Sequence, residues 1–223
     1  MAKRDRGGIT RRRILEAAAA VFEKEGYQAA TVTEIIDRAG VTKGALYFHF
    51  PSKEDLVDGI FDSQDFRVSV PPQTVKLQEL IDTVRVCAYR LHTETLVRAG
   101  FRLALDARRR SPLAGVSPFK EWTADMQRTL RAAESQGELL PHIEPAKTAR
   151  LCVSAFVGLQ LMAENTEENE DIPEQLAVLL CHLLSSIAVP PVLTGLDLSP
   201  SRCHVLEEAG AASEGPEAPA SLV

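Results

Sequence analysis

Apolar residues recur at helical spacing along most of the chain. Between residues 10 and 25 they follow the i, i+4, i+7, i+8 pattern of an amphipathic helix, at Ile14, Leu15, Ala18, Val21 and Phe22. Similar stripes predict further helices at about 74–93, 94–110, 118–136, 144–163 and 173–187. The pattern therefore predicts an all-α fold.

Short helices with clear end signals follow the first one. Thr31 and Glu34 have the spacing of a capping box, so a helix begins after Thr31, and Gly40 ends it about two turns later. The next helix starts near Thr42 and ends before Pro51. Two short helices joined by a tight turn with glycine, after a longer helix, predict a helix-turn-helix.

The helix after Thr42 carries an unusual mixture of residues. Leu46 and Phe50 lie one turn apart and can face a core, whereas Gly44 costs about 1 kcal/mol relative to alanine inside a helix. A glycine is useful there if a partner must approach the backbone closely. Polar donors and one cation surround it, as a recognition helix in a major groove requires. The alternative is that the aromatic residues at 47, 48 and 49 form a core cluster.

This part of the chain resembles the DNA-binding domain of TetR-family repressors over residues 27–56, YQAATVTEIIDRAGVTKGALYFHFPSKEDL. The resemblance implies an N-terminal three-helix helix-turn-helix domain, a C-terminal helical ligand-binding and dimerisation domain, and a homodimer on a pseudo-palindromic operator in double-stranded DNA. It matches Thr42, Lys43, Tyr47 and Lys53 to phosphate contacts, and residues 31 and 33 to the edge of the groove. The residues expected to bind DNA are Thr31, Thr33, Thr42, Lys43, Gly44, Tyr47, His49 and Lys53.

Charge is distributed unevenly along the chain. The 223 residues contain 25 Lys and Arg against 31 Asp and Glu, a net charge of −6. Residues 1–55 nevertheless carry 10 basic against 8 acidic side chains, and six of the first thirteen residues are basic. A basic arm on an acidic body suits one end that binds a polyanion, although a solvated, disordered tail would have the same composition.

The remaining sequence predicts the domain plan. We expect an arm and DNA-binding domain at 1–55, a helical ligand-binding and dimerisation domain at 56–189, and a disordered tail at 190–223, where Pro, Gly, Ala, Ser and Glu dominate. The fourth helix of the chain is expected to run from Lys53 to about Phe66. The last helix is apolar over more than one face, as though a partner subunit also covered it. Pairing of two such helices per subunit is the dimer arrangement that the TetR resemblance implies.

No pattern in the sequence predicts catalysis. The chain has no GxSxG, no HExxH and no phosphate-binding glycine loop after a strand, so we expect no catalytic residues, no cofactor and no metal. The four cysteines are widely spaced, which favours reduced and mainly buried thiols. Because there is neither a secretory signal pattern nor an apolar run of about 18 residues, we expect a cytoplasmic protein without a membrane partner.

The only tryptophan points to a subgroup. The segments around Trp122 (SPFKEW) and at 97–104 (VRAGFRLA) resemble the γ-butyrolactone autoregulator receptors of streptomycetes, in which a Trp here lies over the lactone ring. The acidic composition also resembles the true receptors, whereas relatives that sense antibiotics tend to be basic. A plain core tryptophan is the alternative. Ligand-lining candidates, with Gln64 as the polar anchor, are Gln64, Phe66, Cys87, Leu91, Leu103, Trp122, Val153 and Phe156.

The sequence thus predicts a repressor that releases its operator on binding a small hydrophobic lactone-type signal and controls secondary-metabolite genes. An alternative within regulators is a sensor of a butenolide, furan or antibiotic. Alternatives from other classes are a lactone-acting enzyme with a DNA-binding head and a nucleoid protein without sequence preference.

Overall fold

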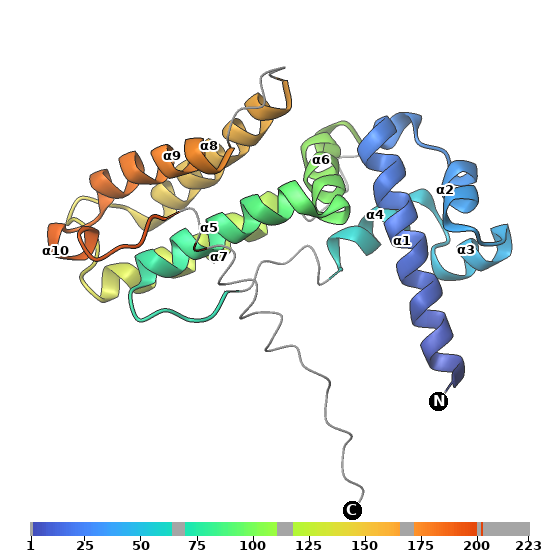
Figure 1. Cartoon of the computed structure of the whole chain (residues 1–223), viewed down its shortest axis with the longest axis horizontal. Coiled ribbons are helices and arrows are strands. Elements are labelled where there is room, and N and C mark those ends of the chain that lie inside the picture. Colours follow the sequence, from blue (N-terminus) through green and yellow to red (C-terminus); the bar gives the residue numbers. More distant parts are fainter. Residues whose placement is uncertain (1, 64–69, 111–117, 166–171, 200–201, 203–223) are drawn as a thin grey trace, which may run out of the picture. The chain divides into compact units, whose positions relative to one another are not determined.

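The computed structural model describes residues 2–63, 70–110, 118–165, 172–199 and 202 (Figure 1). Over these residues the chain is helical, with one isolated bridge between Leu139 and Ala188, which confirms the all-α prediction. The helices are α1 (Ala2–Ala29), α2 (Val32–Ala39), α3 (Lys43–His49), α4 (Lys53–Phe61), α5 (Lys76–Thr93), α6 (Thr95–Arg110), α7 (Pro118–Ser135), α8 (Pro145–Asn165), α9 (Ile172–Ile187) and α10 (Pro190–Leu193).

The helices form two compact units with a boundary that differs from the predicted one. The N-terminal unit contains residues up to 67 together with 90–118, and the C-terminal unit contains 68–89 and the chain from 119 onward. The predicted boundary after residue 55 therefore falls inside α4, and α6 belongs with the DNA-binding end rather than with the ligand-binding domain. The reason is apolar packing, because α6 inserts Leu96, Ala99 and Leu103 into the core of the N-terminal unit.

The first helix is the centre of the N-terminal unit. It packs against α2, α3, α4 and α6 (Figure 1). Its buried stripe includes Ile14 and Phe22, both fully inaccessible, and these meet Ile35 of α2 and Leu46 of α3 in one core. Helical geometry begins at Ala2, so the alternative of a disordered basic tail does not hold from that residue onward.

The predicted helix ends are present. Gly26, with φ of 73°, interrupts α1 where the sequence predicts its end. The capping box is complete, because the Thr31 hydroxyl accepts from the Glu34 backbone N–H and the Glu34 carboxylate accepts from that of Thr31. Gly40 ends α2 in the left-handed region at φ 60° and ψ 40°. Ser52 caps α4 through the backbone N–H of Asp55.

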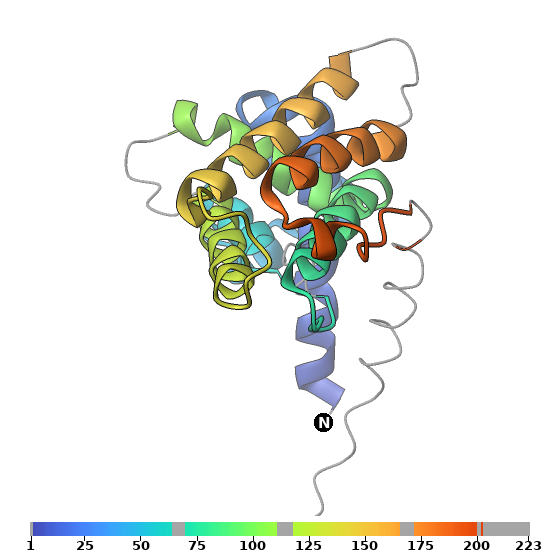
Figure 2. The ribbon, with the colours of Figure 1, turned by 90° about the vertical axis from the view of Figure 1, so that its left-hand side faces the viewer.

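In the C-terminal unit α8 and α9 lie side by side (Figures 1 and 2). The buried face of α9 carries Leu176, Leu180 and Leu184. One buried carboxylate fixes the start of α5: Glu138 accepts from the backbone N–H groups of Lys76 at 2.7 Å and of Leu77 at 2.8 Å. The Glu138 carboxylate thus pairs with two N–H groups that have no acceptor within the helix. It also lies at the positive end of the helix dipole, which favours a negative charge.

The chain after α9 is ordered further than predicted. Residues 190–193 form α10, and the segment after it binds α5, so the prediction of a disordered tail from Pro190 is wrong for the described residues up to 199 and for Arg202. The Asp197 backbone N–H donates to the Gln78 side chain at 2.8 Å. The Arg202 guanidinium forms two bonds, of 2.6 and 3.0 Å, to the fully buried carboxylate of Asp82. Polar side chains on α5, rather than apolar burial, hold this segment.

The cysteines are free thiols where they are described, but the prediction of mainly buried thiols is only partly correct. Cys152 is buried, Cys87 is half-buried and Cys181 is exposed on α9. None of the described helices is both long and apolar enough to span a bilayer.

Candidate nucleic-acid interface and ligand-binding residues

One side of α3 is packed and the other is exposed. Leu46 and Phe50 are buried in the N-terminal core, as predicted. Thr42, Lys43 and Gly44 are exposed at the start of the helix. The alternative that the aromatic residues of α3 form a core cluster does not hold for Tyr47 and Phe48, which are also exposed.

The exposed residues at the start of α3 form a compact polar surface. The Thr42 hydroxyl accepts from the Ala45 backbone N–H at 3.2 Å, which uses an oxygen lone pair and not the hydroxyl proton. The Lys43 ammonium lies 5.9 Å from the centre of the Tyr47 ring, so one cation and one phenol lie side by side. A Cβ added to Gly44 would meet nothing within 4 Å, so nothing in the fold itself requires glycine there.

The second helix contributes less than predicted. Thr33 is exposed in its first turn. The Thr31 hydroxyl, however, donates to the Glu34 carboxylate at 2.7 Å while it accepts from the Glu34 N–H at 3.2 Å. Its single proton is therefore committed to the capping box, and this geometry favours a structural role over the predicted contact at the edge of the groove.

Lys53, which was predicted to contact a phosphate, has structural partners. Its ammonium donates to the backbone carbonyl of Ala30 at 2.6 Å and to that of Tyr27, and it lies 4.4 Å from the centre of the Tyr27 ring. The lysine thus joins the start of α4 to the residues that end α1. Tyr27 completes the junction by donating its hydroxyl proton to Glu54 at 2.6 Å.

Two carboxylates beside the helix-turn-helix have shifted pKa values. The hydrogen bond from the Thr31 hydroxyl lowers the pKa of Glu34, and that from the Tyr27 hydroxyl lowers the pKa of Glu54. Both groups therefore stabilise the folded unit fully above their ordinary pKa of 4.5, and this contribution disappears as the pH falls through the lowered values.

Some of the ligand-lining candidates come together in the C-terminal unit. The Trp122 ring of α7 packs edge-on against the Phe156 ring of α8, with centroids 5.0 Å apart and an angle of 82° between the planes. Val153 lies one turn before Phe156 and is buried as well. Cys87 is half-buried on α5, in the same unit.

The other candidates lie elsewhere. Leu103 is fully buried in the core of the N-terminal unit, where it packs with α1 and α4 residues, so burial in that core accounts for it without a ligand. Leu91 also belongs to the N-terminal unit. Gln64 and Phe66 lie outside the described residues. The prediction that the fourth helix runs to about Phe66 is wrong, because α4 ends at Phe61.

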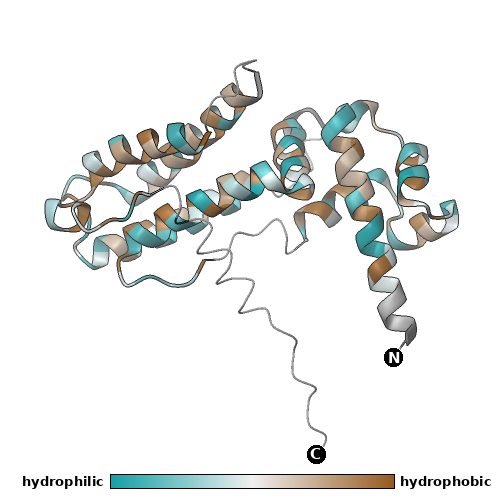
Figure 3. Ribbon diagram, in the orientation of Figure 1, coloured by the Kyte–Doolittle hydropathy of each residue, from teal (hydrophilic) through white to brown (hydrophobic). Residues whose placement is uncertain are grey.

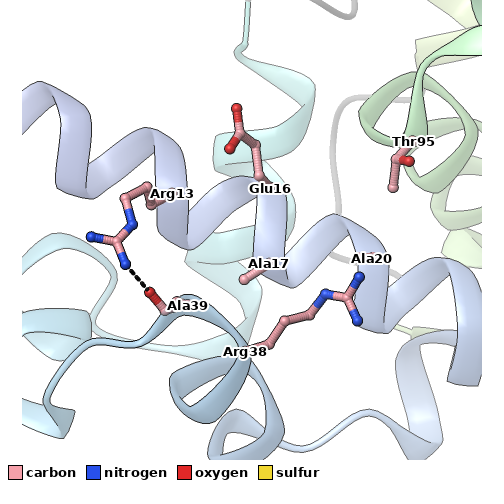
Figure 4. Close-up of a pocket in the computed structure, with 7 residues that line it drawn as sticks. All are labelled: Arg13, Glu16, Ala17, Ala20, Arg38, Ala39 and Thr95. Atoms are coloured by element: carbon pink, nitrogen blue, oxygen red, sulfur yellow. Dashed lines mark hydrogen bonds between the residues drawn. The ribbon is translucent and has the colours of Figure 1, made fainter.

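A pocket on the N-terminal unit does not match the predicted ligand site. It has a volume of about 420 Å³ and includes Arg13, Glu16 and Arg38 among its lining residues (Figure 4). Arg13 reaches across it to the Ala39 carbonyl at 2.8 Å. Sites for small apolar ligands are mostly lined by apolar and aromatic side chains. This charged pocket contains none of the predicted ligand-lining residues.

Comparisons with known proteins identify the chain. The family model described as bacterial regulatory proteins, tetR family, matches residues 14–60, which cover the helix-turn-helix. The A-factor receptor protein of Streptomyces griseus is 39% identical over 193 residues, which are 86% of this chain and 69% of that protein. The chain belongs to the TetR family.

Solved structures of TetR-family proteins agree with this assignment. Native full-length TylP of Streptomyces fradiae, a TetR regulator, matches with a TM-score of 0.80 and 38% identity over 92% of this chain and 98% of that one. An ArpA-like γ-butyrolactone receptor matches with a TM-score of 0.70 and 29% identity over 92% and 99% of the two chains. The predicted family, its γ-butyrolactone receptor branch and the fold class are thereby confirmed.

In this TetR-family chain, one exposed residue of α3 was not among those that the sequence predicted to bind DNA. Phe48 is 83% exposed, the most exposed large apolar side chain among the described residues, and its ring packs edge-on against His49 at 5.1 Å. The signal was available, because Phe48 lies two residues from each of the core positions Leu46 and Phe50 and so faces away from the core. A large apolar group on this surface is suited to contact with thymine methyl groups.

Proposed function

We propose that this protein is a cytoplasmic, homodimeric transcriptional repressor that leaves its operator when a γ-butyrolactone-type signal binds, and that it controls secondary-metabolite genes. One observation carries the DNA-binding half of the proposal. The exposed side of α3 combines a cation, a phenol, a hydroxyl and an exposed glycine on a helix whose other side is fixed in the core. These are the groups that bind phosphates and base edges in a major groove.

The ligand-binding half is supported by relatives and by one aromatic contact. The relatives include an A-factor receptor and a γ-butyrolactone receptor, both similar to this chain beyond the DNA-binding segment. In the C-terminal unit Trp122 and Phe156 form an aromatic pair between α7 and α8. An apolar signal with few polar atoms fits such a site better than it fits the charged pocket on the N-terminal unit.

The proposed dimer interface is supported by exposed apolar residues on α8 and α9. Leu151 and Met162 are 59% and 72% exposed, and their separation of eleven residues puts them on one side of α8. Half-buried Ala155 and Gly158 lie between them on the same stripe, and Val178 is exposed on neighbouring α9. Figure 3 shows apolar residues along both helices. A patch of this kind on two adjacent helices suits a self-complementary interface.

Repression then requires two recognition helices in successive major grooves, about 34–36 Å apart. The signal releases the operator if it binds better to a conformer whose recognition helices have the wrong spacing. A coupling of about 1–3 kcal/mol is typical of such linked sites, and moving occupancy from 99% to 1% takes about 5.5 kcal/mol.

We infer a regulator rather than an enzyme, because the similar proteins are regulators and the sequence has no paired nucleophile and base. Chemical recovery of an added lactone tests this point. Unchanged lactone is expected after prolonged incubation with the protein, and a hydrolysed product would contradict it.

A gel shift on DNA from upstream of the protein's own gene tests the proposal, with and without a synthetic γ-butyrolactone. We expect a specific shift that random DNA does not compete away and that the lactone abolishes. A shift that the lactone leaves intact would contradict the signal and favour a butenolide, furan or antibiotic. Equal affinity for random DNA would contradict the repressor and favour a nucleoid protein.

A further inference from the structure

Two buried hydrogen-bond donors in the C-terminal unit have no acceptor among the residues that the structure describes. They are the indole N–H of Trp122 on α7 and the side-chain amide N–H₂ of Gln160 on α8. Gln160 is only 7% exposed. Buried polar groups in folded proteins are nearly always paired, so two orphan donors in one unit require an explanation.

Both donors lie beside the same aromatic ring. Trp122 packs edge-on against Phe156, with 5.0 Å between the ring centroids. Gln160 follows Phe156 by four residues on α8, and side chains at this spacing are neighbours on a helix surface. Phe156 thus has the Trp122 ring of α7 against it and the Gln160 side chain one turn further along α8.

The surroundings of this pair favour an uncharged ligand. Cys152 precedes Phe156 by four residues, so the stripe on α8 contains a thiol, a phenyl ring and an amide, all buried. Burial raises the pKa of the Cys152 thiol to about 11, which means that this side of α8 disfavours a negative charge. Since both orphan groups are donors, the missing partner is a neutral group that accepts hydrogen bonds.

We propose that Gln160 and Trp122 together bind the carbonyl end of the lactone ligand by donating hydrogen bonds to its oxygen atoms. The inference rests on the proposed function and adds to it the polar anchor of the site. It places that anchor on α8 instead of at Gln64. The pair also sets specificity, because a ligand without an acceptor at this end would leave both donors unpaired in the complex.

Two variants remove one donor each, and Gln160→Leu also keeps the approximate volume of the side chain. Gln160→Leu removes the amide, and Trp122→Phe removes the indole N–H but retains an aromatic ring. Gln127→Leu is the matched control, because Gln127 is a half-buried glutamine on α7 with no proposed role. For each full-length protein, the dissociation constants for a synthetic γ-butyrolactone and for the cyclic ether without the carbonyl are measured by calorimetry. Operator affinity is measured without ligand.

We expect the wild type to prefer the lactone to the ether, and each donor variant to bind the lactone about tenfold or more weakly. The operator affinity of the variants and all properties of Gln127→Leu should match the wild type. Lactone binding by Gln160→Leu at the wild-type affinity would overturn the inference. The same holds if the wild type binds lactone and ether equally well.

A second measurement separates this inference from the proposed function. If the Gln160 amide is unpaired in the free protein, the melting temperature of ligand-free Gln160→Leu should equal or exceed that of the wild type. A fall of more than about 4 °C would show that the amide already has a partner, and would overturn the inference whatever the ligand is. A wild type that binds no lactone would contradict the proposed function, and this melting experiment would still decide whether Gln160 is an unpaired donor.

Discussion

At the scale of single residues, two lysines of the helix-turn-helix have different surroundings. Lys43 is exposed beside Tyr47, whereas the Lys53 ammonium donates to the carbonyls that end α1. In the sequence both are basic residues at the start of a short helix and nothing distinguishes them. The difference arises from tertiary structure, because the end of α1 lies within reach of Lys53.

Salt-dependent binding separates the two roles. Lys43→Ala should weaken operator binding about tenfold or more and lower the slope of log affinity against log salt by about 1, because one phosphate contact is lost. Lys53→Met should leave that slope unchanged and destabilise the N-terminal unit by about 1–2 kcal/mol, since two carbonyls lose their donor. Anisotropy titrations at several salt concentrations and chemical denaturation measure these effects.

Lys24→Ala is the control, because Lys24 is an exposed lysine of the same unit that pairs with Glu25. If Lys53→Met lowered the slope of log operator affinity against log salt and kept full stability, Lys53 would be a phosphate contact. An unchanged operator affinity for Lys43→Ala would refute the assigned surface of α3.

At the scale of elements, the sequence predicted the helices and caps well because their signals are local. As predicted, α2, α3 and α4 begin after the N-cap residues Thr31, Thr42 and Ser52, and α2 ends at Gly40. That α6 belongs to the N-terminal unit could not be predicted. It depends on a tertiary contact, because Leu103 packs in the core of that unit and no local sequence signal indicates this. The segment after α10 was also missed, because its composition resembles that of disordered chains and its partners on α5 lie more than a hundred residues earlier.

A comparison of Gly44 in α3 with Gly59 in α4 tests why α3 contains a glycine. A Cβ at Gly59 of α4 would lie 2.7 Å from the Phe50 ring and 3.0 Å from Leu15, whereas a Cβ at Gly44 would meet nothing within 4 Å. Gly59→Ala should therefore destabilise the unit by about 1–3 kcal/mol. Gly44→Ala should preserve or raise stability, through better helix propensity, yet weaken operator binding through contact with DNA. Melting curves and operator titrations of the two variants check these effects. Full operator affinity for Gly44→Ala would contradict a close approach of DNA to the backbone at Gly44.

The segment after α10 should stabilise the C-terminal unit through Arg202. Removing the guanidinium in Arg202→Ala leaves the buried Asp82 carboxylate without its ion pair, which should cost about 3–5 kcal/mol. The double variant Asp82→Leu/Arg202→Met should recover much of the loss, because it removes the buried carboxylate together with its ion-pair partner. Chemical denaturation of the wild type, Asp82→Leu, Arg202→Met and the double variant gives the coupling free energy of the pair. A stable Arg202→Ala would show that this segment contributes little.

At the scale of the whole molecule, placing two recognition helices in successive major grooves requires a dimer. We propose that its interface is formed by α8 and α9. Leu151→Asp/Met162→Asp should yield a folded monomer, because it places charges in the proposed apolar interface. Its operator affinity should fall steeply, since one recognition helix reads only half of the site. Ala124→Asp, at an exposed position of α7 outside the proposed interface, is the control. Sedimentation of the double variant as a dimer with full operator affinity would contradict this interface.

We propose that the signal and the operator compete through one conformational equilibrium. Titrations of each ligand in the presence and absence of the other measure this coupling. The lactone is titrated by calorimetry into the free protein and into the protein saturated with operator, and operator affinity is measured with and without lactone. We expect the lactone to weaken operator binding and the operator to weaken lactone binding by the same factor, because such coupling is reciprocal. An operator affinity that saturating lactone leaves unchanged, with lactone demonstrably bound, would contradict the account.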